Sequence, residues 1–248
     1  MKNLKSKKCL VLTYENKKNT STQNLIYLCK KNNFDYKIIG QNKEWNGWYG
    51  RTIEYINVLN SIDENKYVVL SDGRDVLINE DCSSFLNKAI NLYSNKKIIF
   101  GAETLCCGAS NILERTAKIK KFIEDYASTR TIYKYKYINF GLMFGTSKNI
   151  KNFLLKLNIK PNDEDQGLAS FEFYSNPNDY IIDYDQLIFN NNVPEDCDLE
   201  WDKNKFKNTI TATYPSFLHF PGKNWNCYSK CADMLFKNED FLYLSGLD

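Results

Sequence analysis

Two aspartates, Asp72 and Asp75, stand three residues apart just after the apolar run at residues 67–70. Carboxylates this close repel each other unless a cation lies between them. Hard oxygen ligands of this kind suit Mg²⁺ or Mn²⁺, and such an ion usually keeps positions open for substrate phosphates. The alternative is an ordinary polar turn, because aspartates are common in turns and at helix caps. The pair alone is compatible with both.

The single histidine of the chain, His219, lies in a second polar segment that ends an apolar run, FLHFPGKNW at residues 217–225. An imidazole would complete a metal shell begun by the aspartates, and it favours Mn²⁺ over Mg²⁺. Gly222 would let the backbone approach a phosphate, and Lys223 would supply a compact positive charge. The alternative is a core histidine with satisfied hydrogen bonds. One histidine excludes a two-histidine iron site and a two-histidine zinc protease motif.

The composition is that of an ordinary globular protein of 248 residues, with 43% hydrophobic and 25% charged residues. Because there is no internal repeat, linker or break in composition, residues 1–248 are predicted to form one domain. The net charge of +3 is too small to indicate nucleic-acid binding. No segment approaches the ~20 apolar residues of a membrane span, and no signal peptide is seen, so we expect a soluble, intracellular protein.

The eight cysteines stand mostly among apolar residues and are predicted to be small buried side chains. Cys227 and Cys231 are closely spaced. With no second spaced pair and one histidine, they do not predict a structural zinc site.

Strands and helices are predicted to alternate over the first two-thirds of the chain. Strands are expected at residues 8–14, 35–40, 67–70, 97–102, 137–145, 180–182, 188–189 and 216–220. Helices are expected from residues 20–23, at 52–62, 83–93, 112–126 and 150–157, from 162–166, and within 227–248, whereas the Trp- and Gly-rich residues 41–52 read as a loop. This alternation predicts an α/β fold with a mostly parallel sheet. Ligands of such folds bind beyond the carboxyl ends of the strands, which is where the two aspartates stand.

The segments Asp72-Gly-Arg-Asp75 and His219-Phe-Pro-Gly-Lys223 together resemble GT-A glycosyltransferases, whose acidic motif and C-terminal histidine hold a divalent cation on a nucleoside-diphosphate sugar. From about Trp45 onward the chain is similar to the glycosyltransferase domain of procollagen lysyl hydroxylase/glucosyltransferase proteins. Five short segments in the same order carry the resemblance: EWNG (44–47), VVLSDGRDVLI (68–78), IIFGAETLCC (98–107), YINFGLMFG (137–145) and NDEDQ (162–166). It implies a GT-A, Rossmann-like fold with a mostly parallel central sheet flanked by helices.

The resemblance also implies roles for individual residues. The metal ligands would be Asp72, Asp75 and His219, and the ion would be Mn²⁺ or Mg²⁺. The donor side would include Thr13, Trp45, Arg51, Arg74, Glu103, Gly222 and Lys223, and the residues facing the sugar or acceptor would be Asn139, Asp163, Asp165 and Gln166. Glu103 and Asn139 have an alternative role, which is to tie loops together by hydrogen bonds. Arg74 replaces the tyrosine that stacks on the nucleobase in the family, and an arginine plane can also stack on a base.

The function implied is transfer of a hexose from UDP-glucose or UDP-galactose to an acceptor hydroxyl, with retention of configuration. The acceptor would be a glycan or a collagen-like peptide carrying hydroxylysine. An alternative is a catalytically inactive protein that binds nucleotide or glycan with a transferase fold, and the replacement of tyrosine by Arg74 favours it. A nucleotidyltransferase ranks last, because residues 13–19 contain no glycine for a phosphate loop. The oligomeric state is left open.

Overall fold

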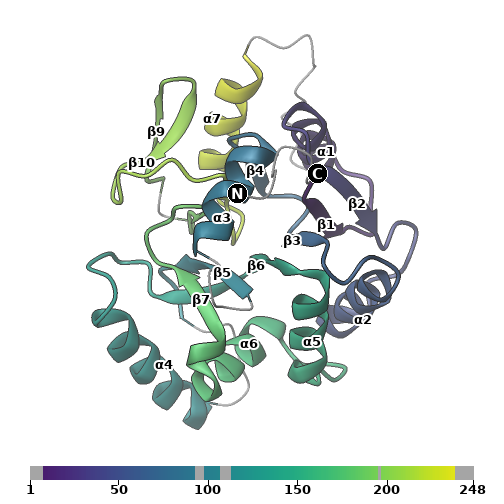
Figure 1. Cartoon of the computed structure of the whole chain (residues 1–248), viewed down its shortest axis with the longest axis vertical. Coiled ribbons are helices and arrows are strands. Elements are labelled where there is room, and N and C mark those ends of the chain that lie inside the picture. The colour runs from purple at the N-terminus through teal and green to yellow at the C-terminus, as the bar shows by residue number, and fades with distance from the viewer. Residues whose placement is uncertain (1–7, 93–97, 107–112, 195–196, 238–248) are drawn as a thin grey trace.

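The apolar runs near the N-terminus form parallel strands of one central sheet. The computed structural model describes residues 8–92, 98–106, 113–194 and 197–237, and within them the sheet has the strand order β2-β1-β3-β6-β5-β7 (Figure 1). These strands are β1 (Leu10–Tyr14), β2 (Asp35–Ile39), β3 (Tyr67–Ser71), β5 (Ile98–Glu103), β6 (Tyr137–Thr146) and β7 (Tyr180–Asp183). Strand β1 is parallel to β2 and β3, and β5 is parallel to β7, whereas β6 is antiparallel to both of its neighbours. The predicted α/β fold with a mostly parallel sheet is confirmed.

Helices cover both faces of this sheet. They are α1 (Thr20–Lys31), α2 (Gly47–Asn60), α3 (Cys82–Leu92), α4 (Leu113–Ser128), α5 (Ser147–Leu157), α6 (Asp165–Ser175) and α7 (Trp225–Phe236), with a short 3-10 helix η2 (Pro177–Asp179) after α6. Because side chains alternate along a strand, Leu12 packs in the core with α2, α4, α5 and α6, while Val11 packs in the core with α1, α3 and α7. The two groups of helices occupy opposite halves of Figure 1. Both faces of the sheet are thus covered, and ligands reach it at the strand ends.

A second, smaller sheet holds the segment that carries the histidine. It contains β4 (Val76–Ile78), β11 (Phe217–His219) and β8 (Phe189–Asn191) in the order β4-β11-β8. Strand β4 follows the aspartate turn directly, and β11 pairs with it in antiparallel register, with His219 opposite Val76. The backbone N–H of Phe220 also donates to the carbonyl of Asp75 at 2.9 Å. Two short strands therefore bring residues 144 positions apart in the sequence to one place.

The structure departs from the sequence prediction in several elements. Helix α2 begins at Gly47, five residues before the predicted start at 52, so the Trp- and Gly-rich stretch is a helix over its last residues and not a loop. Strand β4 and the hairpin of β9 (Leu199–Asp202) and β10 (Lys205–Asn208) were not predicted, because each is only three or four residues long. The predicted elements at residues 93, 97, 112 and 238–248 lie outside the described residues.

Helix α6 begins as its acidic N-terminus predicts. The carboxylate of Glu164 caps the helix by accepting from the backbone N–H of Gly167 at 2.8 Å, which satisfies one of the free donors at this end. Asp165 is then the first residue of the helix, and its side chain is buried. The cap therefore fixes the position from which Asp165 enters the interior.

The cysteines differ in part from the prediction. Cys9, Cys29, Cys82 and Cys231 are buried thiols, as expected of small apolar side chains. Cys197 and Cys227, in contrast, form a disulfide with a Cα–Cα distance of 5.6 Å. Their separation of 30 residues gives no pairing signal in the sequence. None of the described helices combines the length and the apolar character that a membrane crossing requires.

Candidate active site

The three residues with metal-ligand chemistry lie together at one end of the central sheet. One ligand atom from each of Asp72, Asp75 and His219 lies within 4.8 Å of the other two. The Nε2 atom of His219 is 3.6 Å from Asp72 Oδ2 and 3.5 Å from Asp75 Oδ1. In the described part of the chain this is the one group of its kind. Two oxygen donors and one nitrogen donor at this spacing fit a divalent cation, Mn²⁺ better than Mg²⁺.

The imidazole of His219 is fully buried, and its two nitrogens have different surroundings. Nδ1 is 2.7 Å from the side-chain oxygen of Asn191, whereas Nε2 has no hydrogen-bond partner among the described residues. Burial alone would lower the pKa of His219, but the carboxylates of Asp75 and Asp72 outweigh burial and raise the pKa to about 10. Without a metal, a protonated imidazole therefore balances the two carboxylates. An unpartnered nitrogen between two carboxylates is also what a cation site requires.

Asp72 is held by a buried arginine. Arg51 donates from NH1 to Asp72 Oδ1 at 2.8 Å and from NH2 to Asp165 Oδ2 at 2.5 Å. Its guanidinium also lies 4.5 Å from the ring centroid of Trp48, on the preceding turn of α2. Burial would raise the pKa of Asp72, but Arg51 and His219 outweigh it and hold the pKa well below its usual range. Asp72 is thus a carboxylate with Oδ1 engaged by arginine and Oδ2 nearest to the histidine.

Glu103, Asn139 and Gln166 form a hydrogen-bonded group under the site. Gln166 Nε2 donates to Glu103 Oε1 at 2.6 Å, and Asn139 Nδ2 donates to Glu103 Oε2 at 3.3 Å. The group connects the ends of β5 and β6 to the first turn of α6. Burial raises the pKa of Glu103 to about 7. The geometry is that of the alternative role for Glu103 and Asn139, which is to tie loops together by hydrogen bonds. Direct contact of either residue with a ligand stays a prediction.

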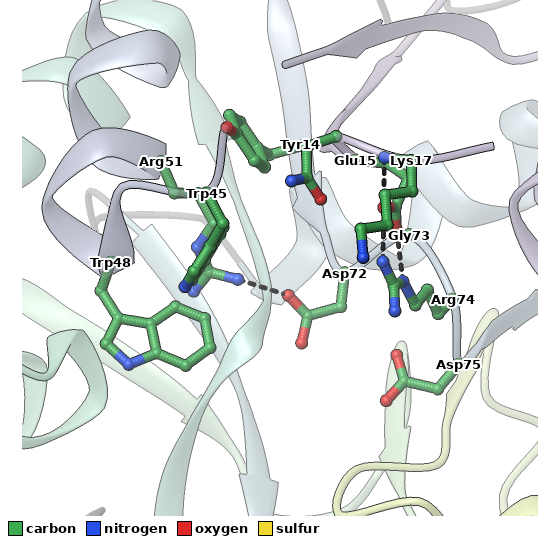
Figure 2. Close-up of a pocket in the computed structure, with 11 residues that line it drawn as sticks. Tyr14, Glu15, Lys17, Trp45, Trp48, Arg51, Asp72, Gly73, Arg74 and Asp75 are labelled. Carbon is green, nitrogen blue, oxygen red and sulfur yellow. Dashed lines mark hydrogen bonds and ion pairs between the residues drawn. The ribbon is translucent and has the colours of Figure 1, made fainter. Parts of the chain in front are cut away.

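A cavity of about 460 Å³ opens beside Asp72 and Asp75. Figure 2 shows Trp45 and Trp48 on one side of Asp72 and Arg74 on the other. The Trp45 indole is 48% exposed although it contacts Tyr14 and Trp48 edge to face, with ring centroids 5.8 and 5.1 Å apart. A half-exposed tryptophan on the wall of a cavity is an available stacking surface.

The opposite wall contains a fixed guanidinium. Arg74 donates from Nε to Glu15 Oε2 and from NH2 to Glu15 Oε1, both at 2.6 Å, which is a bidentate ion pair. Glu15 is buried at the carboxyl end of β1. Burial would raise the pKa of Glu15, but the bond to Arg74 outweighs burial and lowers it. The plane of Arg74 is therefore held in one orientation.

Four further predicted site residues are not among those that line this cavity. Asp163 accepts from the backbone N–H of Lys160 in the turn before α6, at 2.8 Å. Thr13 is buried beneath the aspartate turn, where a side chain on Gly73 would meet its Oγ1 at 2.9 Å. Gly222 and Lys223 lie on the loop between β11 and α7, and neither is among the residues that line the cavity. Their predicted roles stay predictions.

Several residues of the site were missed in the sequence analysis. They are Tyr14, Glu15, Lys17, Trp48, Gly141 and Asn191. Glu15 and Asn191 stand at the carboxyl ends of strands, so the rule that drew attention to the aspartates would also have found them. Lys17, and not Lys223, is the lysine that lines the cavity, and Figure 2 shows it extending between Trp45 and Arg74.

Comparisons with known proteins identify the family of the chain. A family model described as the PLOD GT domain matches residues 5–230. An uncharacterized protein, R699, of Acanthamoeba polyphaga mimivirus is 29% identical over 202 residues, which are 78% of this chain and 41% of that protein. The multifunctional procollagen lysine hydroxylase and glycosyltransferase of Caenorhabditis elegans is 22% identical over 233 residues, which are 86% of this chain and 30% of that protein. The chain thus spans less than half the length of both relatives.

A solved structure has a similar fold. It is a glycosyltransferase involved in the glycosylation of the major capsid of PBCV-1, with a TM-score of 0.52 and 12% identity. The match covers 93% of this chain and 99% of that one. At this level of identity the likeness concerns the fold, and it shows that the arrangement of sheet and helices is that of GT-A glycosyltransferases.

Proposed function

The chain belongs to the PLOD GT domain family of glycosyltransferases, and from this premise we propose that it transfers a hexose from UDP-glucose or UDP-galactose to an acceptor hydroxyl in a metal-dependent reaction. The observation that carries the proposal is the convergence of Asp72, Asp75 and His219 beside a cavity with aromatic and cationic walls. These three residues would hold Mn²⁺ or, less favourably, Mg²⁺. The chemistry that the cation supplies when bound is neutralisation of charge on the departing diphosphate.

The residues around the cation site favour the binding of a cation and a diphosphate. Arg51 holds Asp72 in its ionised form, so no proton has to leave that carboxylate before a cation binds. Lys17 lines the same cavity and would add a second positive charge beside the diphosphate. A well-placed group that stabilises developing charge is typically worth ~3–4 kcal/mol of the activation free energy.

The cavity walls suit a nucleoside. The half-exposed ring of Trp45 and the fixed plane of Arg74 both offer a flat face to a base. Stacking of this kind is worth ~1–3 kcal/mol per base and tolerates different bases. The preference for uridine is therefore inferred from the family and not from a hydrogen bond to the base.

The transferred sugar would lie toward Asp165 and Gln166. Asp165 is buried and paired with Arg51, and Gln166 is fixed by Glu103. Neither side chain is free to act as a nucleophile, which suits a retaining transfer in which the acceptor attacks from the face that the nucleotide leaves. The acceptor would be a hydroxylysine-containing, collagen-like peptide or a glycan, and the name of the Caenorhabditis elegans relative favours the peptide.

The ion pair of Arg74 and Glu15 supports a second candidate function, nucleotide binding without turnover. Because both oxygens of Glu15 engage Arg74, the family's aromatic stacking partner is replaced by a group that is committed to the protein. Such a protein would bind UDP with Mn²⁺ and release no UDP from a UDP-sugar.

Measurement of UDP release from UDP-glucose and UDP-galactose tests these alternatives. The assay compares Mn²⁺, Mg²⁺ and EDTA, with and without a hydroxylysine-containing collagen-like peptide. We expect release that needs Mn²⁺ and that falls at least 100-fold, or ~2.7 kcal/mol, in Asp72→Asn and Asp75→Asn. Metal-dependent turnover that survives in both variants contradicts the metal assignment. If UDP raises the melting temperature with Mn²⁺ but no UDP-sugar is turned over, the second candidate is correct.

A further inference from the structure

Asn191 contacts the imidazole of His219 on the edge away from the two aspartates. Strands β8 and β11 are parallel neighbours, and their register places Asn191 beside His219. Asn191 Oδ1 lies 2.7 Å from His219 Nδ1, and both side chains are fully buried. The contact therefore takes place without competition from water.

The surroundings of Asn191 determine which way its amide faces. Its Nδ2 group donates to the carbonyl oxygen of Ala102 at 3.0 Å, and a carbonyl oxygen can only accept. The amide oxygen must then face His219. Because this oxygen is also only an acceptor, Nδ1 of the imidazole must carry the hydrogen. In the neutral ring the lone pair is then on Nε2, the nitrogen that lies between the carboxylates.

The backbone of Asn191 is fixed as well. Its N–H donates to Gln186 Oε1 at 2.9 Å, and Gln186 Nε2 donates to the carbonyl of Ala102, also at 2.9 Å. Gln186 and Asn191 thus share one acceptor on β5, and both are fully buried. This closed set of hydrogen bonds leaves the Asn191 side chain little freedom to rotate.

Two glycines make room for the pair. A Cβ atom on Gly101 would clash with the Asn191 amide nitrogen, and a Cβ atom on Gly141 would clash with the imidazole of His219. Strands β5 and β6 therefore carry no side chain where they lie against Asn191 and His219. The site accommodates an asparagine–histidine pair of one orientation.

We propose that Asn191 is a positioning residue that fixes the orientation and tautomer of His219, so that Nε2 presents its lone pair to a divalent cation. The inference rests on the proposed role of His219 as a metal ligand. Without the Asn191 oxygen, the ring can rotate or place its hydrogen on Nε2, and either change removes the nitrogen donor. Partners of this kind typically contribute 10- to 100-fold to metal affinity.

The affinity for Mn²⁺, measured by electron paramagnetic resonance of the free ion, tests the proposal without an activity assay. Asn191→Ala is compared with Asn190→Ala, a matched control. Asn190 is equally buried and donates to the same Gln186 oxygen that Asn191 uses, but its side chain makes no hydrogen bond with His219. We expect the Kd for Mn²⁺ to rise 10- to 100-fold in Asn191→Ala and less than 3-fold in Asn190→Ala.

The single histidine permits a direct second measurement on the wild-type protein. A ¹H–¹⁵N correlation spectrum of the imidazole, recorded with saturating Mg²⁺, shows which ring nitrogen carries the hydrogen. We expect the hydrogen on Nδ1. A hydrogen on Nε2 with Nδ1 bare overturns the proposal, even if Asn191→Ala does not fold.

The outcomes separate this proposal from the proposed function. A wild-type protein that does not bind Mn²⁺ overturns both. If the wild type binds Mn²⁺ and Asn191→Ala binds it as well as Asn190→Ala does, the positioning role is wrong and the metal site stands.

Discussion

Arg51 and Asp165 form a buried ion pair, with NH2 2.5 Å from Oδ2, between residues 114 positions apart in the sequence. The second NH group of the same guanidinium binds Asp72. One arginine therefore joins helix α2, helix α6 and the aspartate turn. The shape of the site depends on a guanidinium that is largely buried.

Replacement of Arg51 by methionine should destabilise the protein strongly. Buried Asp165 and partly exposed Asp72 would lose their cation, and removal of one partner of a buried ion pair typically costs about 3–5 kcal/mol. Urea denaturation measures this loss. The control is Lys43→Met, which breaks the exposed pair with Glu54 and should cost less than about 1 kcal/mol. Equal effects of the two substitutions would show that Arg51 has no special structural role.

Replacement of Gly141 by alanine should damage the cation site more than the fold. The new methyl group would clash with the His219 ring and lie 2.8 Å from Asp72 Oδ2, so the two ligands must change position relative to each other. We expect at least a 10-fold loss of Mn²⁺ affinity, since a displaced imidazole loses its place in the ligand set. Isothermal titration with Mn²⁺ gives the affinity, and circular dichroism verifies that the variant is folded. Unchanged affinity would place the cation elsewhere.

The burial of Glu103 should give stability a specific dependence on pH. The folded protein raises the pKa of Glu103 to about 7, against an ordinary value of 4.5. The folded state therefore holds a proton that the unfolded state releases, and the stability from this group is lost as pH rises from about 4.5 through 7. The stability of the wild type relative to Glu103→Gln should fall over this range and level off above it.

Melting temperatures at half-unit steps of pH measure this difference. The control is Glu64→Gln on the surface, where the bond with Lys148 lowers the pKa of Glu64 and moves its effect below pH 4.5. If the difference between the melting temperatures of the wild type and Glu103→Gln is constant from pH 4.5 to 7, Glu103 is ionised in the folded protein throughout this range.

The wall formed by Arg74 should decide how tightly a nucleotide binds. Arg74→Ala removes a stacking surface worth ~1–3 kcal/mol, so the Kd for UDP with Mn²⁺ should rise about 10-fold or more. Arg74→Tyr restores the aromatic residue of the family and should recover the affinity. Both variants leave Glu15 without its partner, so a difference between them reports on stacking alone. If both bind UDP like the wild type, the base does not contact this wall.

The parts of this protein that sequence patterns predict are those that depend on local periodicity. Apolar runs and turn residues identified the main strands, and the position of Asp72 and Asp75 after a strand identified the end of the sheet where they lie. Their meeting with His219 depends on pairing between β4 and β11, two strands of three residues that carry almost no periodic signal. A resemblance to a family with the same three residues was needed to predict it.

The residues that the sequence analysis missed at the site have a common physical cause. The partners of Glu15 and Asn191 are 59 and 28 residues distant. Contacts over such distances follow from tertiary packing and not from spacing.

The disulfide between Cys197 and Cys227 closes a covalent loop, and His219 lies inside it. Strand β11, which carries His219, is thus tethered on both sides by the disulfide-closed loop. Reduction of the disulfide removes this constraint on the position of His219. Protein prepared in a reducing bacterial cytosol therefore differs from protein prepared in an oxidising periplasm in whether this disulfide is formed. Metal affinities measured on the two preparations can be compared only when the free thiol content of each is known.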